Sequence, residues 1–196
     1  MLRARKLLLT AAAAATALAL AGCTGGSMPG MDMGSEPAAS DSQAASVNNA
    51  DVMFAQMMIP HHEQAIEMSD MLLQKDGVDP RVTELATKIK DAQQPEIDQL
   101  REWLDQWGED ESPMSGMNHG GGMMSDDDMA ALEAATGADA AKLFLEQMVA
   151  HHQGAIEMAQ TEVDGGKNTG AIAMAQSIID TQTDEITTMQ ELLASL

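Results

Sequence analysis

The stretches Phe54-Ala-Gln-Met-Met-Ile-Pro-His-His-Glu-Gln-Ala-Ile-Glu-Met68 and Phe144-Leu-Glu-Gln-Met-Val-Ala-His-His-Gln-Gly-Ala-Ile-Glu-Met158 are two copies of one motif. They contain four of the five histidines of the chain. A repeat of this kind indicates a duplicated structural unit. The identical pairs, 90 residues apart, are Phe54/Phe144, Met58/Met148, His61/His151, His62/His152, Ala65/Ala155, Ile66/Ile156, Glu67/Glu157 and Met68/Met158.

The duplicated unit is longer than the motif. The segment Asp91-Ala-Gln-Gln-Pro-Glu-Ile97 follows the first copy, and Asp180-Thr-Gln-Thr-Asp-Glu-Ile186 follows the second. Capping residues, glycines and apolar residues of helical period predict helices over 48–75, 79–107, 125–135, 139–163 and 169–193. Two amphipathic hairpins that cannot each bury their apolar faces alone predict an all-α four-helix bundle over residues 48–196.

Pro60 lies inside the first predicted helix, directly before His61. A proline removes one hydrogen bond within the helix and should kink it there. The second copy has Ala150 at the equivalent position, so we expect the two half-sites to differ.

The N-terminus predicts export and lipid attachment. Residues 1–22 contain Arg3, Arg5 and Lys6, then an apolar run and small residues before Cys23, the only cysteine. This arrangement is typical of a lipoprotein signal peptide, and it resembles the bacterial lipobox. We therefore expect lipid on Cys23 and a location on the extracytoplasmic face of the cell membrane. Residues 23–47 then predict a flexible tether, which carries Met28, Met31 and Met33.

The net charge of the full chain is −21. Phosphates would be repelled, so nucleic acid is excluded as a natural partner. With Cys23 lipidated, no disulfide is possible within the chain.

The motif carries ligand chemistry for a soft or borderline metal ion. On a helix, Met58, His61 and His62 share one face, and Met68 lies two turns beyond His61. Imidazole together with thioether favours copper, particularly Cu(I) where no thiolate is available. The predicted metal ligands are therefore His61, His62, His151, His152, Met58, Met68, Met148 and Met158.

The alternative is that these side chains only pack. The repeat separates the methionines, because Met53 stands opposite Leu143, Met174 opposite Leu85 and Met189 opposite Leu100. Methionines that exchange with leucine are interpreted as packing residues. Met57, opposite Gln147, is a weaker candidate ligand than the retained methionines. Glu67 and Glu157 are expected to be solvated or to contact a metal ligand, and not to bind the metal themselves.

The segment 108–124 predicts a Met- and His-rich loop within the bundle domain. Met114, Met117 and His119 have no packing role in a polar loop, so they are predicted to capture copper transiently. The alternative for this loop is a tolerated low-complexity composition.

Enzyme functions have little support. Glu-x-x-His, as in di-iron bundles, and His-Glu-x-x-His do not occur. Gly-x-Ser-x-Gly is absent too. A redox enzyme using bound copper or iron is a third hypothesis that no motif supports.

The doubled pattern Phe-x3-Met-x2-His-His-x2-Ala-Ile-x-Met resembles the family known as domain of unknown function 305, over about residues 48–196. The resemblance implies a ferritin-like four-helix bundle, export and, in some members, copper binding and resistance. The family's histidine pairs fall on His61, His62, His151 and His152. Its methionines fall on Met58, Met68, Met148 and Met158. The insert at 108–124 departs from the family's compact pattern.

Two hypotheses of function remain. The first is a lipid-anchored protein that binds copper, buffers it or passes it between a donor and an acceptor protein. Because imidazole binds metal only when neutral, its affinity should fall below the ordinary histidine pKa of about 6.5. The second is a metal-independent interaction module of the envelope, with structural His-His pairs. Oligomeric state and metal stoichiometry stay open.

Overall fold

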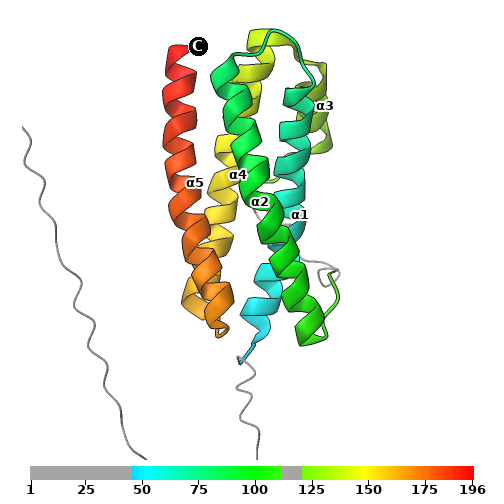
Figure 1. The fold of residues 1–196 in the computed structure, drawn as a ribbon, viewed down its shortest axis with the longest axis vertical. Helices are drawn as coiled ribbons and strands as arrows, with labels where there is room; N and C mark the ends of the chain where they lie inside the picture. Colours follow the sequence, from blue (N-terminus) through cyan, green and yellow to red (C-terminus); the bar gives the residue numbers. More distant parts are fainter. Residues whose placement is uncertain (1–45, 112–120) are drawn as a thin grey trace, which may run out of the picture. The chain divides into compact units, whose positions relative to one another are not determined.

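The computed structural model describes residues 46–111 and 121–196, and these two ranges form five α-helices and no strand (Figure 1). The predicted all-α bundle is confirmed. The signal peptide, Cys23 and most of the tether lie outside the described residues. The helices are α1 (Asn49–Leu73), α2 (Pro80–Trp107), α3 (Asp126–Ala134), α4 (Gly137–Gly165) and α5 (Thr169–Ser195).

Local sequence explains where the helices begin and end. The Asn48 side chain accepts the N–H groups of Ala50 and Asp51, and the Asp51 carboxylate accepts the Asn48 N–H at 2.6 Å, which completes a capping box. Asp79 caps α2 and is followed by Pro80 in the first turn. Gly108 ends α2 with a φ of 72°, which glycine adopts without strain. Helix α1 continues without a break through Pro60.

The two hairpins pack through the helices that carry the motif. Helix α1 packs against α2, and α4 packs against α5, while α1 and α4 contact each other at the centre. The α2–α5 contact is weak. Figure 1 shows α1 and α4 running in opposite directions, so the two motifs pass each other near their middle. The short helix α3 lies against α1 and α4.

The apolar interior is divided into two cores. Core A lies at the C-terminal end of α1 and the N-terminal end of α4, and core B lies at the opposite ends. Core A consists of Ala65, Met68, Leu72, Val82, Leu85, Ala86, Ile89, Leu132, Ala140, Ala141, Phe144, Leu145, Met148, Met189 and Leu192. Core B consists of Phe54, Ala55, Met58, Ile59, Ile97, Leu100, Leu104, Ala155, Ala159, Ala171, Ala175 and Ile178.

Equivalent residues of the two copies lie in opposite cores. Phe54 and Met58 belong to core B, whereas Phe144 and Met148 belong to core A. The two hairpins are therefore related by an approximate two-fold axis that passes between α1 and α4. None of the helices described is long and apolar enough to cross a membrane.

Candidate metal centre

Four buried imidazoles lie between core A and core B, and we call His61, His62, His151 and His152 the histidine layer. Each of these side chains is at most 1% exposed. The rings of His61 and His151 meet across the α1–α4 contact, with their centroids 3.7 Å apart and their planes tilted by 38°. The His151 and His152 centroids are 6.5 Å apart. The structure thus brings both predicted histidine pairs into one place.

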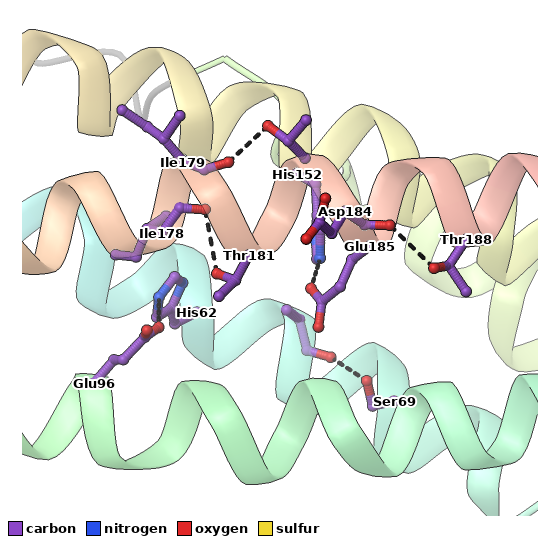
Figure 2. A network of polar contacts seen from close by, with 12 residues as sticks. His62, Ser69, Glu96, His152, Ile178, Ile179, Thr181, Asp184, Glu185 and Thr188 are labelled. Atoms are coloured by element: carbon purple, nitrogen blue, oxygen red, sulfur yellow. Dashed lines mark hydrogen bonds and ion pairs between the residues drawn. The ribbon is translucent and has the colours of Figure 1, made fainter.

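The second histidine of each pair is held by a carboxylate from the next helix. His62 Nε2 lies 2.8 Å from Glu96 Oε2, and His152 Nε2 lies 2.7 Å from Glu185 Oε2 (Figure 2). A neutral ring that donates its Nε2–H to the carboxylate keeps Nδ1 as an unprotonated acceptor. Both Nδ1 atoms are buried, with no hydrogen-bond partner among the described residues. A carboxylate behind an imidazole is a common arrangement at metal sites.

The first histidine of each pair has no hydrogen-bond partner in the described ranges, at either ring nitrogen. Burial lowers the pKa of His61 to about 3, and the neighbouring His62 and His152 add to this effect, while the backbone of Gly121 opposes it. Burial lowers the pKa of His151 well below its usual range, and the electrostatic effect of the neighbouring His61 adds to this shift. Both rings are therefore neutral at lower pH than an exposed histidine. The loss of affinity expected below pH 6.5 moves to lower pH for these two rings.

Two glutamines occupy core positions at the same level of the bundle. Gln93 lies on α2 between Ile89 of core A and Ile97 of core B, and Gln182 is its equivalent on α5. Both are 3% exposed, and neither Oε1 atom has a hydrogen-bond partner in the described part of the chain. The polar character of this level therefore extends to all four long helices.

Sequence reasoning did not assign a role to Glu96, Glu185, Gln93 or Gln182. The signal was nevertheless present, because the repeated segment after each motif keeps glutamine and glutamate at these equivalent positions. Acidic side chains are frequent on the exposed faces of this chain, so only the packing of the helices distinguishes these two carboxylates.

The four motif methionines lie on the two sides of the histidine layer. Met58 is fully buried in core B, and Met158 is partly exposed and packs against the same core. Met68 and Met148 are fully buried in core A. The sequence predicted that four imidazoles and four thioethers are metal ligands. The structure groups the imidazoles and divides the thioethers, two to each side.

Other sequence predictions can be placed as well. Glu67 and Glu157 are exposed, as expected for solvated residues. Met189 is buried in core A, and Met174 packs against core B, in agreement with packing roles. Met114, Met117 and His119 lie outside the described residues.

The described end of the 108–124 loop is fixed close to the motifs. The Gln64 side chain donates to the Met124 carbonyl at 2.9 Å and accepts the Met124 N–H at 2.7 Å. On the facing helix, the Gly121 carbonyl oxygen lies where a side chain on Gly154 would stand. Gly154 is the equivalent of Gln64 in the second copy, so both motifs contact the described end of this loop at equivalent positions.

The donor types of the histidine layer fit a metal ion, but the donor atoms do not converge on one position that an ion could occupy. Among residues 46–111 and 121–196, no group of three or more His, Cys, Asp or Glu side chains is placed to hold a metal. Six buried ring nitrogens without partners are nevertheless costly in an apolar interior. The layer supplies imidazole nitrogen donors, with thioether sulfurs on both sides.

Comparisons with known proteins show which family shares this fold. A family model described as Domain of unknown function (DUF305) matches residues 51–193. The solved structure of a DUF305 protein from Streptomyces coelicolor is 31% identical, with a TM-score of 0.70, over 74% of this chain and 93% of its own. A DUF305 fragment from Deinococcus radiodurans is 30% identical, with a TM-score of 0.68, over 76% of this chain and 99% of its own.

A further similar structure is CopM in the Cu(I)-bound form, which is 30% identical with a TM-score of 0.62. The match covers 74% of this chain and 96% of CopM. CopM has also been solved in Cu(II)-bound, Ag-bound and apo forms. No curated protein matches the chain. The family model and the similar structures cover most of the chain, and they confirm the resemblance seen in the doubled motif: the chain belongs to the DUF305 family.

Proposed function

We propose that this protein binds copper, with a preference for Cu(I), and that it buffers the ion or hands it over outside the cytoplasm. The observation that carries the proposal is the His61–His151 contact. Two buried imidazoles meet ring to ring, and none of their four nitrogens makes a hydrogen bond of good geometry in the described ranges. Unpaired buried polar atoms destabilise a fold, so their presence points to a ligand that they bind.

The relatives support the choice of metal. CopM has been solved with Cu(I), Cu(II) and Ag bound, and it shares the fold at about 30% identity. Cu(I) and Ag(I) are soft ions that favour thioether and imidazole donors. The histidine layer and the flanking methionines offer these two donor types.

Copper is the cargo of this proposed site. His61 and His151 offer either ring nitrogen, whereas His62 and His152 offer Nδ1, with Glu96 and Glu185 holding the opposite nitrogen. Because these donors do not converge in the structure, binding requires rotation of at least one ring or recruitment of a flanking thioether.

The metal-independent interaction module is the less favoured function. The bonds from His62 to Glu96 and from His152 to Glu185 would suit a structural role, because they tie α1 to α2 and α4 to α5. That role gives no reason for His61 and His151, which form no such bond. The structural hypothesis therefore explains half of the histidine layer.

A competition titration with Cu(I) tests the proposal. The full-length protein and the His61→Leu/His151→Leu variant are titrated against a chromogenic chelator of known affinity. Loss of an outer partner of a metal ligand typically weakens binding about 10- to 100-fold, so loss of two ligands should weaken it by more than about 100-fold. Unchanged affinity in the variant would remove the histidine layer from the copper site.

A charge-matched pair of variants tests the supporting carboxylates. Glu96→Gln/Glu185→Gln should weaken Cu(I) binding by about 10- to 100-fold, because the second histidine of each pair loses its orienting partner. Glu67→Gln/Glu157→Gln removes the same charge from exposed positions of the two motifs and should leave the affinity unchanged. Equal effects of the two pairs would show that only net charge matters.

We also propose that lipid on Cys23 holds the protein to the extracytoplasmic face of the membrane. The support is the order of segments in residues 1–23, where basic residues are followed by an apolar run and then by small residues before Cys23. Cys23→Ser should move the protein from the membrane fraction to the soluble fraction, and a Cys23→Ser protein that stays with the membrane would contradict the anchor. Within this proposal, Met114, Met117 and His119 capture copper transiently and exchange it with a donor or acceptor protein.

A further inference from the structure

A cavity of about 290 Å³ lies between the first turns of α1 and the last turns of α4, and its lining begins about one helical turn from His61, at Met57. Three methionines line it. Met53 and Met57 are four residues apart on α1 and therefore share a face, and Met158 faces them from α4. All three residues are partly exposed. The remaining lining residues are Ala50, Phe54, Thr161 and Glu162.

Glu162 is the one acidic residue in the lining, and it is unsatisfied. It is 1% exposed, and neither carboxyl oxygen has a hydrogen-bond partner of good geometry among the described residues. Burial raises the pKa of Glu162 to about 8, and the adjacent Asp51 carboxyl adds to the shift. Asp51 itself takes the N–H groups of Lys167 and Asn168 at 2.9 and 2.7 Å. The loop thus stabilises the Asp51 carboxylate, and the Glu162 carboxyl lies beside it.

The second copy shows what this groove looks like when its role is packing. Around the equivalent position, Leu143 and Gln147 replace Met53 and Met57, and Leu72 replaces Glu162. Helix α3 covers that side: Leu132 is fully buried in core A, and Gln147 donates to the Asp128 carbonyl at 2.9 Å. The first copy has no such cover in the described ranges, and it places two thioethers and a carboxyl there instead.

We propose that this cavity is a second metal site, which binds one monovalent soft cation, Cu(I) or Ag(I), through Met53, Met57 and Met158, with Glu162 as the counter-charge. Thioether sulfur selects soft ions. Three neutral sulfurs and one carboxylate balance a single positive charge, which a buried site requires. Met53 is therefore assigned to a ligand role in place of packing, since its exchange with Leu143 reflects a site that only one copy has. This site shares Met158 with the ligands predicted from the motif, but it uses none of the four histidines.

Silver titration of the full-length protein tests this site separately from the histidine layer. In the His61→Leu/His151→Leu background, Met53→Leu/Met57→Leu/Met158→Leu should bind one equivalent of Ag(I) fewer than the background protein. Leucine is close to methionine in size, and Leu143 already occupies the equivalent of position 53, so helix content should be preserved. Met174→Leu, a methionine of α5 outside the cavity, is the control and should keep every equivalent.

A second variant keeps the three sulfurs. Glu162→Gln should weaken this Ag(I) equivalent by roughly tenfold without changing the number of sulfur neighbours seen by X-ray absorption. The same number of equivalents with unchanged affinity in the triple methionine variant would overturn the proposal. The Ag(I) equivalent could also be lost already when His61→Leu/His151→Leu is compared with the wild type, with no further loss when the three methionines are replaced. That result would assign the equivalent to the histidine layer and would likewise overturn this site.

Discussion

His61 and His151 differ from the histidines that follow them in sequence, although all four are buried. Consecutive residues of a helix point about 100° apart, so His61 and His151 face the α1–α4 contact while His62 and His152 face the neighbouring helix. The first pair lacks hydrogen-bond partners in the described ranges, and the second pair has carboxylate partners. The same residue type should thus have opposite effects on stability at adjacent positions.

This difference gives a prediction for the metal-free protein. His61→Leu/His151→Leu removes unpaired buried nitrogens and should raise the free energy of unfolding by about 1–3 kcal/mol. His62→Leu/His152→Leu leaves Glu96 and Glu185 without their partners and should lower it by a similar amount. Urea denaturation in the presence of a chelator measures both. Destabilisation by both pairs of substitutions would favour structural histidines throughout the layer.

At the scale of elements, the sequence predicts the helices well because each end has its own chemical signal. Asn48, Asp79 and Ser125 cap helices as expected, and Gly108 ends α2. The main difference is at α4, which begins at Gly137 and extends to Gly165, beyond the expected 139–163. Such ends depend on packing, which a local pattern does not contain.

The candidate site was less predictable than the helices. The motif identifies the four histidines, but spacing on one helix cannot show which helix each ring faces. The pairing of Glu96 with His62 depends on how α1 and α2 pack, and the ring contact of His61 with His151 depends on how the hairpins pack. The ligand role proposed for Met53 could not be predicted for the same reason, because the repeat does not show that α3 covers only one of the two grooves.

Helix α4 and the loop at Gly121 are close enough for a sharp test. Gly154→Ala would normally stabilise a helix by up to about 1 kcal/mol. Here the new Cβ would collide with the Gly121 backbone, so the protein should instead lose about 1–3 kcal/mol of stability. Gly165→Ala is the control, because its Cβ would meet only Ala50 at an ordinary 3.6 Å. Thermal denaturation of both variants gives the comparison, and equal behaviour would contradict the close contact at Gly154.

At the scale of the whole molecule, two kinds of buried group set opposite limits on stability. His61, with a pKa of about 3 in the fold, stays neutral while the unfolded chain takes up protons, so stability falls as pH drops from 6.5 towards 3. Glu162, with a pKa of about 8, keeps its proton while the unfolded chain loses it, so stability falls as pH rises from 4.5 to 8. The metal-free protein should therefore be less stable below about pH 4.5 and above about pH 6.5 than between these two values, where the two effects oppose each other.

Glu162→Gln should flatten the alkaline side of this profile. In the pH 4.5–8 window, Glu162 contributes a slope of up to about 1.4 kcal/mol per pH unit, and the amide contributes none. Urea midpoints at pH 7 and pH 8, where His61 is largely neutral in both the folded and the unfolded chain, should therefore differ less in the variant than in the wild type. Glu157→Gln, on the exposed face of α4, is the control and should keep the wild-type difference. Parallel profiles for Glu162→Gln and the wild type would show that Glu162 ionises normally in the fold.

The approximate two-fold axis beside His61 and His151 has a consequence for how such a site can be assembled. One hairpin contributes to both core A and core B, yet it completes neither, and it brings one histidine of the central contact. A chain of half this length would have to associate with a copy of itself, so its site would disappear on dilution. Joining the halves in one polypeptide makes the site independent of protein concentration, and it frees each half to diverge from the other.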